Sequence, residues 1–154
     1  MTYRLTDSVA YLLNRAGTRS AELFARRLVP YGITVSMHRV LVALHDQHDQ
    51  SLSDLSAMTS IEISTLSRMV STMMRHDLVS RERLGSDGRT VTISLTGAGQ
   101  TLAKQVIPLA IHQEQIGLRS LDPEVVEQLK RSLIAFYENL DTLEDELRSG
   151  QPVT

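Results

Sequence analysis

The sequence predicts a mainly α-helical chain that carries one small β-hairpin. Apolar residues recur at three- and four-residue steps along most of the chain, which is the period of an amphipathic helix. Residues 78–83 and 90–95 instead alternate as strands do, with turn residues between them. The chain has 154 residues and no cysteine. Its core therefore needs no disulfide, and thiolate zinc sites, cysteine nucleophiles and thiol redox switches are excluded.

The first two helices are predicted from apolar periodicity and from their end signals. Residues 5–28 form the first, with starting caps at residues 6–8, and Pro30 and Gly32 end it. The second is expected to begin at Thr34 and to present an apolar face as far as the polar run HDQHDQ.

A short helix, a corner and a longer helix follow. Ser53 is a suitable cap for a helix over residues 53–58, and residues 59–60 form the polar corner. The longer helix covers residues 62–76. Its predicted inward face consists of Leu66, Met69, Val70 and Met73.

The predicted hairpin joins the strands 78–83 and 90–95 through Gly-Ser-Asp-Gly at residues 85–88, a sequence typical of turns. Thr96 then caps a long helix that ends near residue 117.

The last helix begins at Asp122 and Pro123 and carries a regular apolar seam. The apolar residues alternate between three- and four-residue steps, as the a and d positions of a heptad repeat do: Val126, Leu129, Leu133, Phe136, Leu140, Leu143 and Leu147. Such a seam can lie inside one subunit or pair with a second copy. A helix of about 25 residues is longer than one small lobe can cover, so dimerisation is the better interpretation.

The order of short helix, corner, second helix and hairpin is that of a winged helix-turn-helix, in which the second helix enters the major groove of DNA. The exposed face of helix 62–76 offers hydroxyls and arginines: Ser64, Thr65, Ser67, Arg68, Ser71, Thr72 and Arg75. Between residues 64 and 89 there are five arginines against three acids, in a chain of formal net charge −2. Each such residue alone could be ordinary solvated surface. Hydroxyls lower helix propensity, however, so the joint pattern favours a DNA-contacting role.

The block from residue 51 to residue 100 resembles the DNA-binding lobe of the MarR family, the multiple-antibiotic-resistance-type regulators. The matching pieces are Leu-Val-x-Arg at 78–81, Asp-Gly-Arg at 87–89 and Leu-Thr-x-x-Gly at 95–99. Similar proteins usually carry glycine where this chain has Asp77. That position is expected to need a left-handed backbone, which aspartate tolerates better than most residues.

The resemblance implies a homodimer whose body is built from residues 1–33 and 97–150, with residues 34–96 as the winged helix-turn-helix lobe. The residues expected to make the dimer contacts are Leu5, Val9, Leu12, Val126, Leu129, Leu133, Phe136, Leu140 and Leu143. In the wing, Arg89 would enter the minor groove, held by Asp87, and Arg83 would add a further DNA contact. A twofold dimer implies a pseudo-palindromic operator with half-sites about 10 base pairs apart, or a multiple of that.

The function implied is that of a cytoplasmic, sequence-specific transcriptional regulator, most commonly a repressor, released from DNA by a small effector such as an aromatic carboxylate. An enzyme is not expected, because the sequence has no glycine-rich phosphate loop, nucleophile elbow or HExxH motif. No membrane span and no cofactor are expected. The alternatives are an architectural DNA-binding protein and a protein–protein adaptor that senses no ligand.

Arg15, Arg19 and His38 are the candidate effector contacts. Arg19 lies at the edge of the apolar stripe of the first helix and could bind a ligand carboxylate, form an intersubunit salt bridge or extend to water. His38 could donate to a phenol or carboxylate, or be a satisfied interface residue. The spacing of His45 and His48 could suit a transition metal, but no further ligands are evident, so no metal site is predicted.

Overall fold

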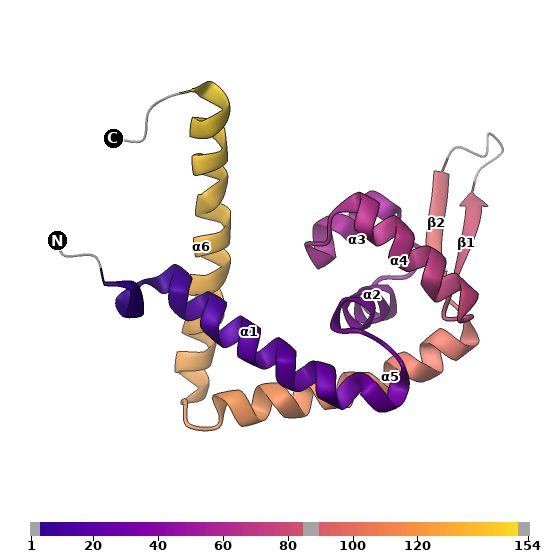
Figure 1. Ribbon diagram of the computed structural model, residues 1–154, viewed down its shortest axis with the longest axis horizontal. Helices are drawn as coiled ribbons and strands as arrows, with labels where there is room; N and C mark the ends of the chain where they lie inside the picture. Colours follow the sequence, from indigo (N-terminus) through magenta and orange to yellow (C-terminus); the bar gives the residue numbers. More distant parts are fainter. Residues whose placement is uncertain (1–3, 85–89, 151–154) are drawn as a thin grey trace. The chain divides into compact units, whose positions relative to one another are not determined.

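The computed structural model describes residues 4–84 and 90–150, and these form six α-helices, two short 3-10 helices and one antiparallel hairpin (Figure 1). The elements are η1 (Leu5–Asp7), α1 (Val9–Leu28), η2 (Val29–Tyr31), α2 (Val35–Asp46), α3 (Leu52–Thr59), α4 (Ile63–Arg75), β1 (Val79–Leu84), β2 (Thr90–Leu95), α5 (Gly97–Leu118) and α6 (Pro123–Ser149). The predicted fold class is confirmed. The chain up to Gln113 forms one compact unit and the chain from Glu114 forms a second. The predicted division into a DNA-binding lobe and a dimer body stays a prediction.

Two predicted helix starts differ from the structure. The first helix is interrupted at Ser8, whose extended backbone separates η1 from α1 and whose side chain makes no capping bond. The cap of α3 is Ser51 rather than Ser53. Ser51 Oγ accepts from the Asp54 N–H at 3.1 Å, and the Asp54 carboxylate accepts from the Ser51 N–H at 3.3 Å. This reciprocal capping box places Leu52 in the first turn.

The core of the first unit lies where α2, α4 and the hairpin meet. Leu41 and Leu44 of α2 are completely buried, as are Leu66, Val70 and Met73 of α4. These three α4 residues belong to the predicted inward face, and Met69 packs partly buried beside them. Further core residues come from α1, α3, the strands and α5, and include Phe24, Leu28, Leu55, Ile93, Ala103 and Val106.

The hairpin pairs Val79 with Leu95 and Leu84 with Thr90 in antiparallel register. The predicted turn at residues 85–88 lies outside the described residues. Gln50 extends the pairing, because its N–H donates to the Ile93 carbonyl at 3.1 Å and its own carbonyl accepts from the Ile93 N–H at 2.8 Å. The loop between α2 and α3 is thus bonded to the hairpin that follows α4.

The junction between α4, β1 and α5 depends on Asp77 and Thr96. Asp77 has φ 56°, so the expectation of a left-handed backbone is confirmed. This conformation ends α4, and the Leu78 N–H donates to the Met73 carbonyl at 3.0 Å. Thr96 Oγ1 donates to the Asp77 carbonyl and accepts from the Gly99 N–H at 3.0 Å, so one hydroxyl ties the end of α4 to the first turn of α5.

The second unit consists mainly of α6 (Pro123–Ser149). Gly150, which follows it, has a left-handed backbone that ends the helix. In the described part of this unit, no residue of α6 is buried. The apolar seam is confirmed as helical, and the exposed fractions of its members from Leu129 onward range from 36% at Phe136 to 67% at Leu147. Among the described residues, no helix is long and apolar enough to cross a membrane.

Candidate nucleic-acid interface

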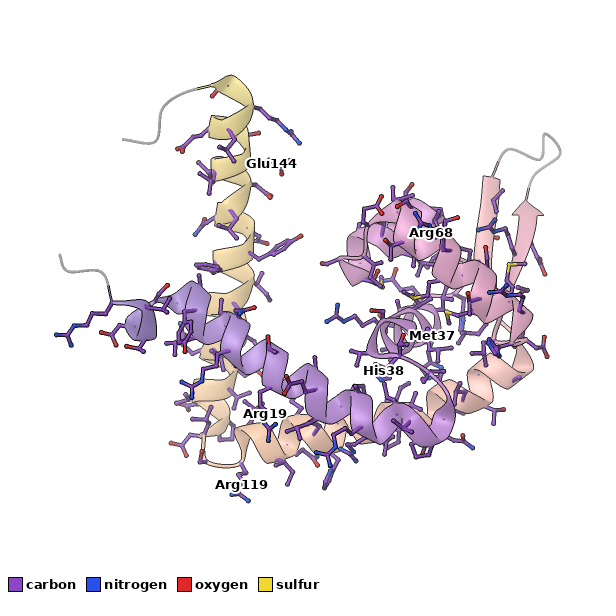
Figure 2. The ribbon with its side chains drawn as sticks, in the orientation of Figure 1. Arg19, Met37, His38, Arg68, Arg119 and Glu144 are labelled. Atoms are coloured by element: carbon purple, nitrogen blue, oxygen red, sulfur yellow. The ribbon has the colours of Figure 1, made fainter. Side chains whose placement is uncertain are left out.

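The polar face of α4 lies opposite its buried residues. We call this surface the α4 polar face; it consists of Ser64, Thr65, Ser67, Arg68, Ser71, Thr72 and Arg75, all exposed or half-buried. The sequence-based list for this helix therefore falls on one surface, as the helical period predicts. Figure 2 shows Arg68 on this helix.

Two hydroxyls of this face bond back to the helix backbone. Ser71 Oγ donates to the Ser67 carbonyl at 2.9 Å, and Thr72 Oγ1 donates to the Arg68 carbonyl at 3.2 Å. Thr72 Oγ1 also accepts from Arg75 Nη2 at 3.0 Å, which orients that guanidinium along the helix. Because these side chains are short and bond back to the backbone, they project little from α4. The DNA can therefore approach the helix closely.

A groove of about 720 Å³ runs between α4 and β1. We call it the arginine groove; it is lined by Arg68, Ser71, Thr72, Met74, Arg75 and Arg81. No described residue forms an ion pair with any of its three guanidinium groups. Three arginines that have no ion-pair partner among the described residues create a site of positive potential at one groove, which suits phosphate oxygens.

Arg81 was not among the predicted DNA contacts, although it was counted in the local positive charge. Arg81 belongs to β1 and lines the arginine groove beside Arg68 and Arg75 of α4. That placement depends on how the hairpin packs against α4, so the sequence pattern alone does not predict it. The remaining predicted wing contacts, Asp87 and Arg89, lie outside the described residues, and of Arg83 the structure describes the backbone pairing with Val91.

Glu62 is a second residue near this surface that was not among the predicted DNA contacts. It occupies the cap position of α4, where its carboxylate accepts from the Ser64 N–H at 2.9 Å and from the Thr65 N–H at 3.0 Å. The Ser64 hydroxyl also donates to it. The Ser64 hydroxyl and the two backbone N–H groups lower the pKa of Glu62 to about 2.

His38 is buried on α2. The residue is 8% exposed, and its ring meets Phe24 edge-on with 4.7 Å between centroids. Among the residues that the structure describes, Nε2 has no hydrogen-bond partner. Burial, with a smaller contribution from the Arg39 guanidinium, lowers the pKa of His38 below its usual value, so the ring is neutral at pH 7. An unsatisfied buried nitrogen is costly, so it marks a place where a polar partner would be accommodated.

A cavity of about 890 Å³ adjoins His38; we call it the His38 cavity. Its lining comes from α2, the end of α3, the corner and α5: His38, Arg39, Val42, Ala43, His45, Asp46, Met58, Thr59, Ser60 and Ile107. The other two candidate effector contacts do not line it. Arg15 and Arg19 lie on α1 beside a separate hollow, where Arg19 Nη1 is 3.7 Å from Glu22 Oε2.

The His45 and His48 pair has no further ligands near it in the described part of the chain, where no group of three or more His, Cys, Asp or Glu side chains could hold a metal ion. His45 contributes instead to the wall of the His38 cavity.

Comparison with known proteins identifies relatives that match most of the length of this chain. Residues 33–91 match the model of the MarR family. The chain is 26% identical over 141 residues to the HTH-type transcriptional repressor IacR of Pseudomonas putida, covering 92% of this chain and 84% of that protein. It is 27% identical over 120 residues to the repressor NicR of the same species, covering 78% and 76%.

Solved structures agree with the sequence matches. Bordetella bronchiseptica BpsR, whose DNA binding is regulated by 6-hydroxynicotinic acid, has a TM-score of 0.76 and 26% identity, covering 86% of this chain and 97% of that one. CouR from Rhodococcus jostii, solved with p-coumaroyl-CoA bound, has a TM-score of 0.80 and 24% identity, covering 88% and 95%.

Proposed function

The chain belongs to the MarR family of winged helix-turn-helix transcriptional regulators, and on that premise we propose that it is a dimeric repressor whose operator is released when a small effector binds. As a regulator of this family it is a DNA-binding protein and not an enzyme. The observation that carries the proposal is the α4 polar face with the arginine groove beside it. Binding to chromosomal DNA would place the protein in the cytoplasm.

In this proposal the α4 polar face enters the major groove, where its hydroxyls and Arg68 meet base edges and phosphates. The arginine groove binds the phosphate backbone beside α4, with Arg81 supplying the contact from β1. At the wing, Arg89 enters the minor groove and Asp87 holds it in place. Arg83 of β1 adds a further positive contact to the DNA. The positive charge is local, since the whole chain has a formal net charge of −2.

Titration of the purified protein against its own upstream DNA, at several salt concentrations, tests DNA binding. We expect salt-sensitive binding with two chains per operator. Arg89→Ala should weaken operator and non-specific binding together and reduce the salt slope by about one unit, since one phosphate-region contact is lost. Arg119→Ala is the matched control, because it removes an exposed arginine from the second unit.

Unchanged affinity of Arg89→Ala at moderate salt would contradict the wing assignment. No binding by the wild-type chain beyond that of a neutral protein at low salt would instead favour the adaptor alternative.

The dimer in this proposal forms through α1 and α6, using the apolar residues predicted from the sequence. Leu5, Val9 and Leu12 are about half exposed in the single chain, as are the leucines of the α6 seam. Exposed apolar side chains at heptad spacing favour pairing with a second copy. Arg15 and Arg19 belong to α1, one of the two helices proposed to pair, and both remain candidate effector contacts.

The effector in this proposal is a compact aromatic carboxylate bound in the His38 cavity. The relative BpsR responds to 6-hydroxynicotinic acid, which has this chemistry. The neutral His38 ring, which lines the cavity, would hydrogen-bond to the ligand, and the Arg39 guanidinium at the cavity wall would meet the carboxylate. Binding would favour a spacing of the two DNA-binding lobes that does not match the operator.

A panel of hydroxylated and unsubstituted aromatic carboxylates, assayed by thermal shift and by release of operator DNA, tests this site. At least one compound should raise the melting temperature and weaken DNA binding. His38→Leu should reduce its affinity about tenfold, the effect of one lost hydrogen bond, while DNA binding without effector is kept. Insensitivity of both assays to the whole panel would remove the support for effector sensing.

A further inference from the structure

The cap position before α4 carries a fixed negative charge. Glu62 is exposed, and its carboxylate is held in place by three donors, namely the Ser64 N–H, the Thr65 N–H and the Ser64 hydroxyl. These bonds occupy both carboxylate oxygens, yet each oxygen retains acceptor capacity. The same bonds keep the pKa of Glu62 near 2, so the group is ionised at every pH used to study DNA binding.

The charge of Glu62 contrasts with that of the rest of the helix. From Ile63 to Arg75 the sequence contains no acid, and Arg68 and Arg75 line the arginine groove with Arg81. A carboxylate that met a DNA phosphate would be repelled, whereas the arginines would be attracted. The N-terminal residues of the recognition helix in a helix-turn-helix contact base edges. Glu62 caps this end of α4, so with α4 in the major groove its carboxylate lies at the base edges.

Base edges in the major groove differ in what they offer to a carboxylate, which can only accept. Guanine presents two acceptors and thymine an acceptor and a methyl group. Adenine presents a donor, but its N7 acceptor lies beside that donor. Cytosine alone presents an amino donor without a neighbouring acceptor on its own edge.

We propose that Glu62 is a specificity-determining residue that accepts a hydrogen bond from the amino group of a cytosine in each operator half-site. The inference rests on the proposed DNA-binding function and adds a residue and a base to it. The two hydrogen-bonded backbone groups pre-orient the carboxylate, so little side-chain freedom is lost when the base contact forms.

Helix capping is the competing role for Glu62. A residue that only caps α4 would change stability, and with it the affinity for every DNA sequence alike. A residue that reads a base changes the preference at one position of each half-site and leaves the preferences elsewhere as they were. Base preference is therefore the measurement that separates the two roles.

The experiment begins by selecting operators from random double-stranded DNA with the wild-type chain. Each conserved cytosine is then replaced by thymine, and the ratio of dissociation constants is measured for wild type and for Glu62→Gln. Glutamine keeps the side-chain length and an oxygen that can cap the helix, but it has no charge. Glu138→Gln, on exposed α6, is the matched control for loss of one negative charge.

For wild type and for Glu138→Gln we expect a ratio of about fivefold or more at one cytosine, corresponding to the lower range for a base contact. Glu62→Gln should bring that ratio close to one, leave the other positions unchanged and gain preference for adenine there, since glutamine pairs with the adenine edge. Its affinity for non-specific DNA should rise, because a charge that repels phosphates is gone.

Unchanged base preferences in Glu62→Gln would overturn the proposal. If Glu62→Gln loses its fold, as seen by a lowered melting temperature, Glu62→Asn decides, because asparagine is a strong helix cap without charge. Retention of the cytosine preference by a folded Glu62→Asn would equally overturn it. A wild-type chain that enriches no sequence at all would instead refute the DNA-binding function on which the inference rests.

Discussion

Replacing Gly99 with alanine is expected to destabilise the first unit by about 3 kcal/mol or more, the upper range for inserting one carbon into a packed site. A Cβ at this position would lie 1.9 Å from the Leu78 carbonyl oxygen and 2.9 Å from the Leu78 carbonyl carbon. Both atoms are backbone, so no side chain can rotate away. The Leu78 carbonyl also accepts from the Thr96 N–H at 3.2 Å, which fixes it against α5.

Thermal unfolding provides the measurement. For a chain of this size, each kcal/mol shifts the melting temperature by about 2–4 °C, so Gly99→Ala should melt roughly 6–12 °C lower. Gly97→Ala is the matched control, since nothing lies within 4 Å of a Cβ there and the residue begins the same helix. We expect the control to be neutral or slightly stabilising. Equal melting temperatures for the two variants would show that α5 shifts freely over β1.

The same junction shows how far sequence reasoning reaches. Asp77 was expected to be left-handed because it replaces a glycine, and its φ of 56° follows from the need to turn from α4 into β1. Thr96 was expected to cap α5 and does so through the Gly99 N–H. Each of these features is local, since it depends on residues within a few positions along the chain. The reason why position 99 must be glycine is not local, because the obstructing carbonyl belongs to Leu78.

The candidate site likewise has features that local sequence predicts and features that depend on tertiary packing. The α4 polar face was predictable, since one helical period determines it. The arginine groove was not, because it requires Arg81 of β1 to lie beside Arg68 and Arg75 of α4, and that depends on how the hairpin packs. The Glu62 cap could have been found from its place before Ser64 and Thr65, since acidic side chains near a helix start accept from free N–H groups.

Burial of His38 and the exposure of α6 are consequences of tertiary packing. The helical period places His38 near Met37 and Leu41, but the edge-on contact with Phe24 requires α1 to pack there. For α6, heptad spacing predicted an apolar seam without deciding what covers it. Within the second unit, as far as the structure describes it, no residue of α6 is buried. The seam therefore supports the proposed dimer more directly than the spacing alone.

The combined substitution of Leu133 and Leu140 by glutamate is expected to convert the protein into a monomer. Two copies would bury these four leucines, each contributing about 1.5–3 kcal/mol, and a glutamate at the same place would leave an unpaired charge in the interface. Leu133 and Leu140 are 37% and 46% exposed, and neither belongs to the buried core. The monomer should therefore keep its helical content.

Light scattering measures the association state and fluorescence anisotropy measures DNA binding. Ala135→Glu with Thr142→Glu is the matched control, because both residues are exposed on the side of α6 away from the seam and the added charge is the same. The control should remain a dimer with wild-type operator affinity. A dimeric double seam variant would refute pairing through α6.

The monomer also separates two contributions to operator binding. Its single lobe keeps the α4 polar face and the arginine groove, so its affinity for non-specific DNA per chain should change little. Operator affinity should fall by at least 100-fold, because the second half-site no longer binds as part of the same molecule. A fall in operator affinity with non-specific binding kept would mean that the selectivity of this regulator depends on the spacing of its two lobes. An effector in the His38 cavity would have to change that spacing to release the operator.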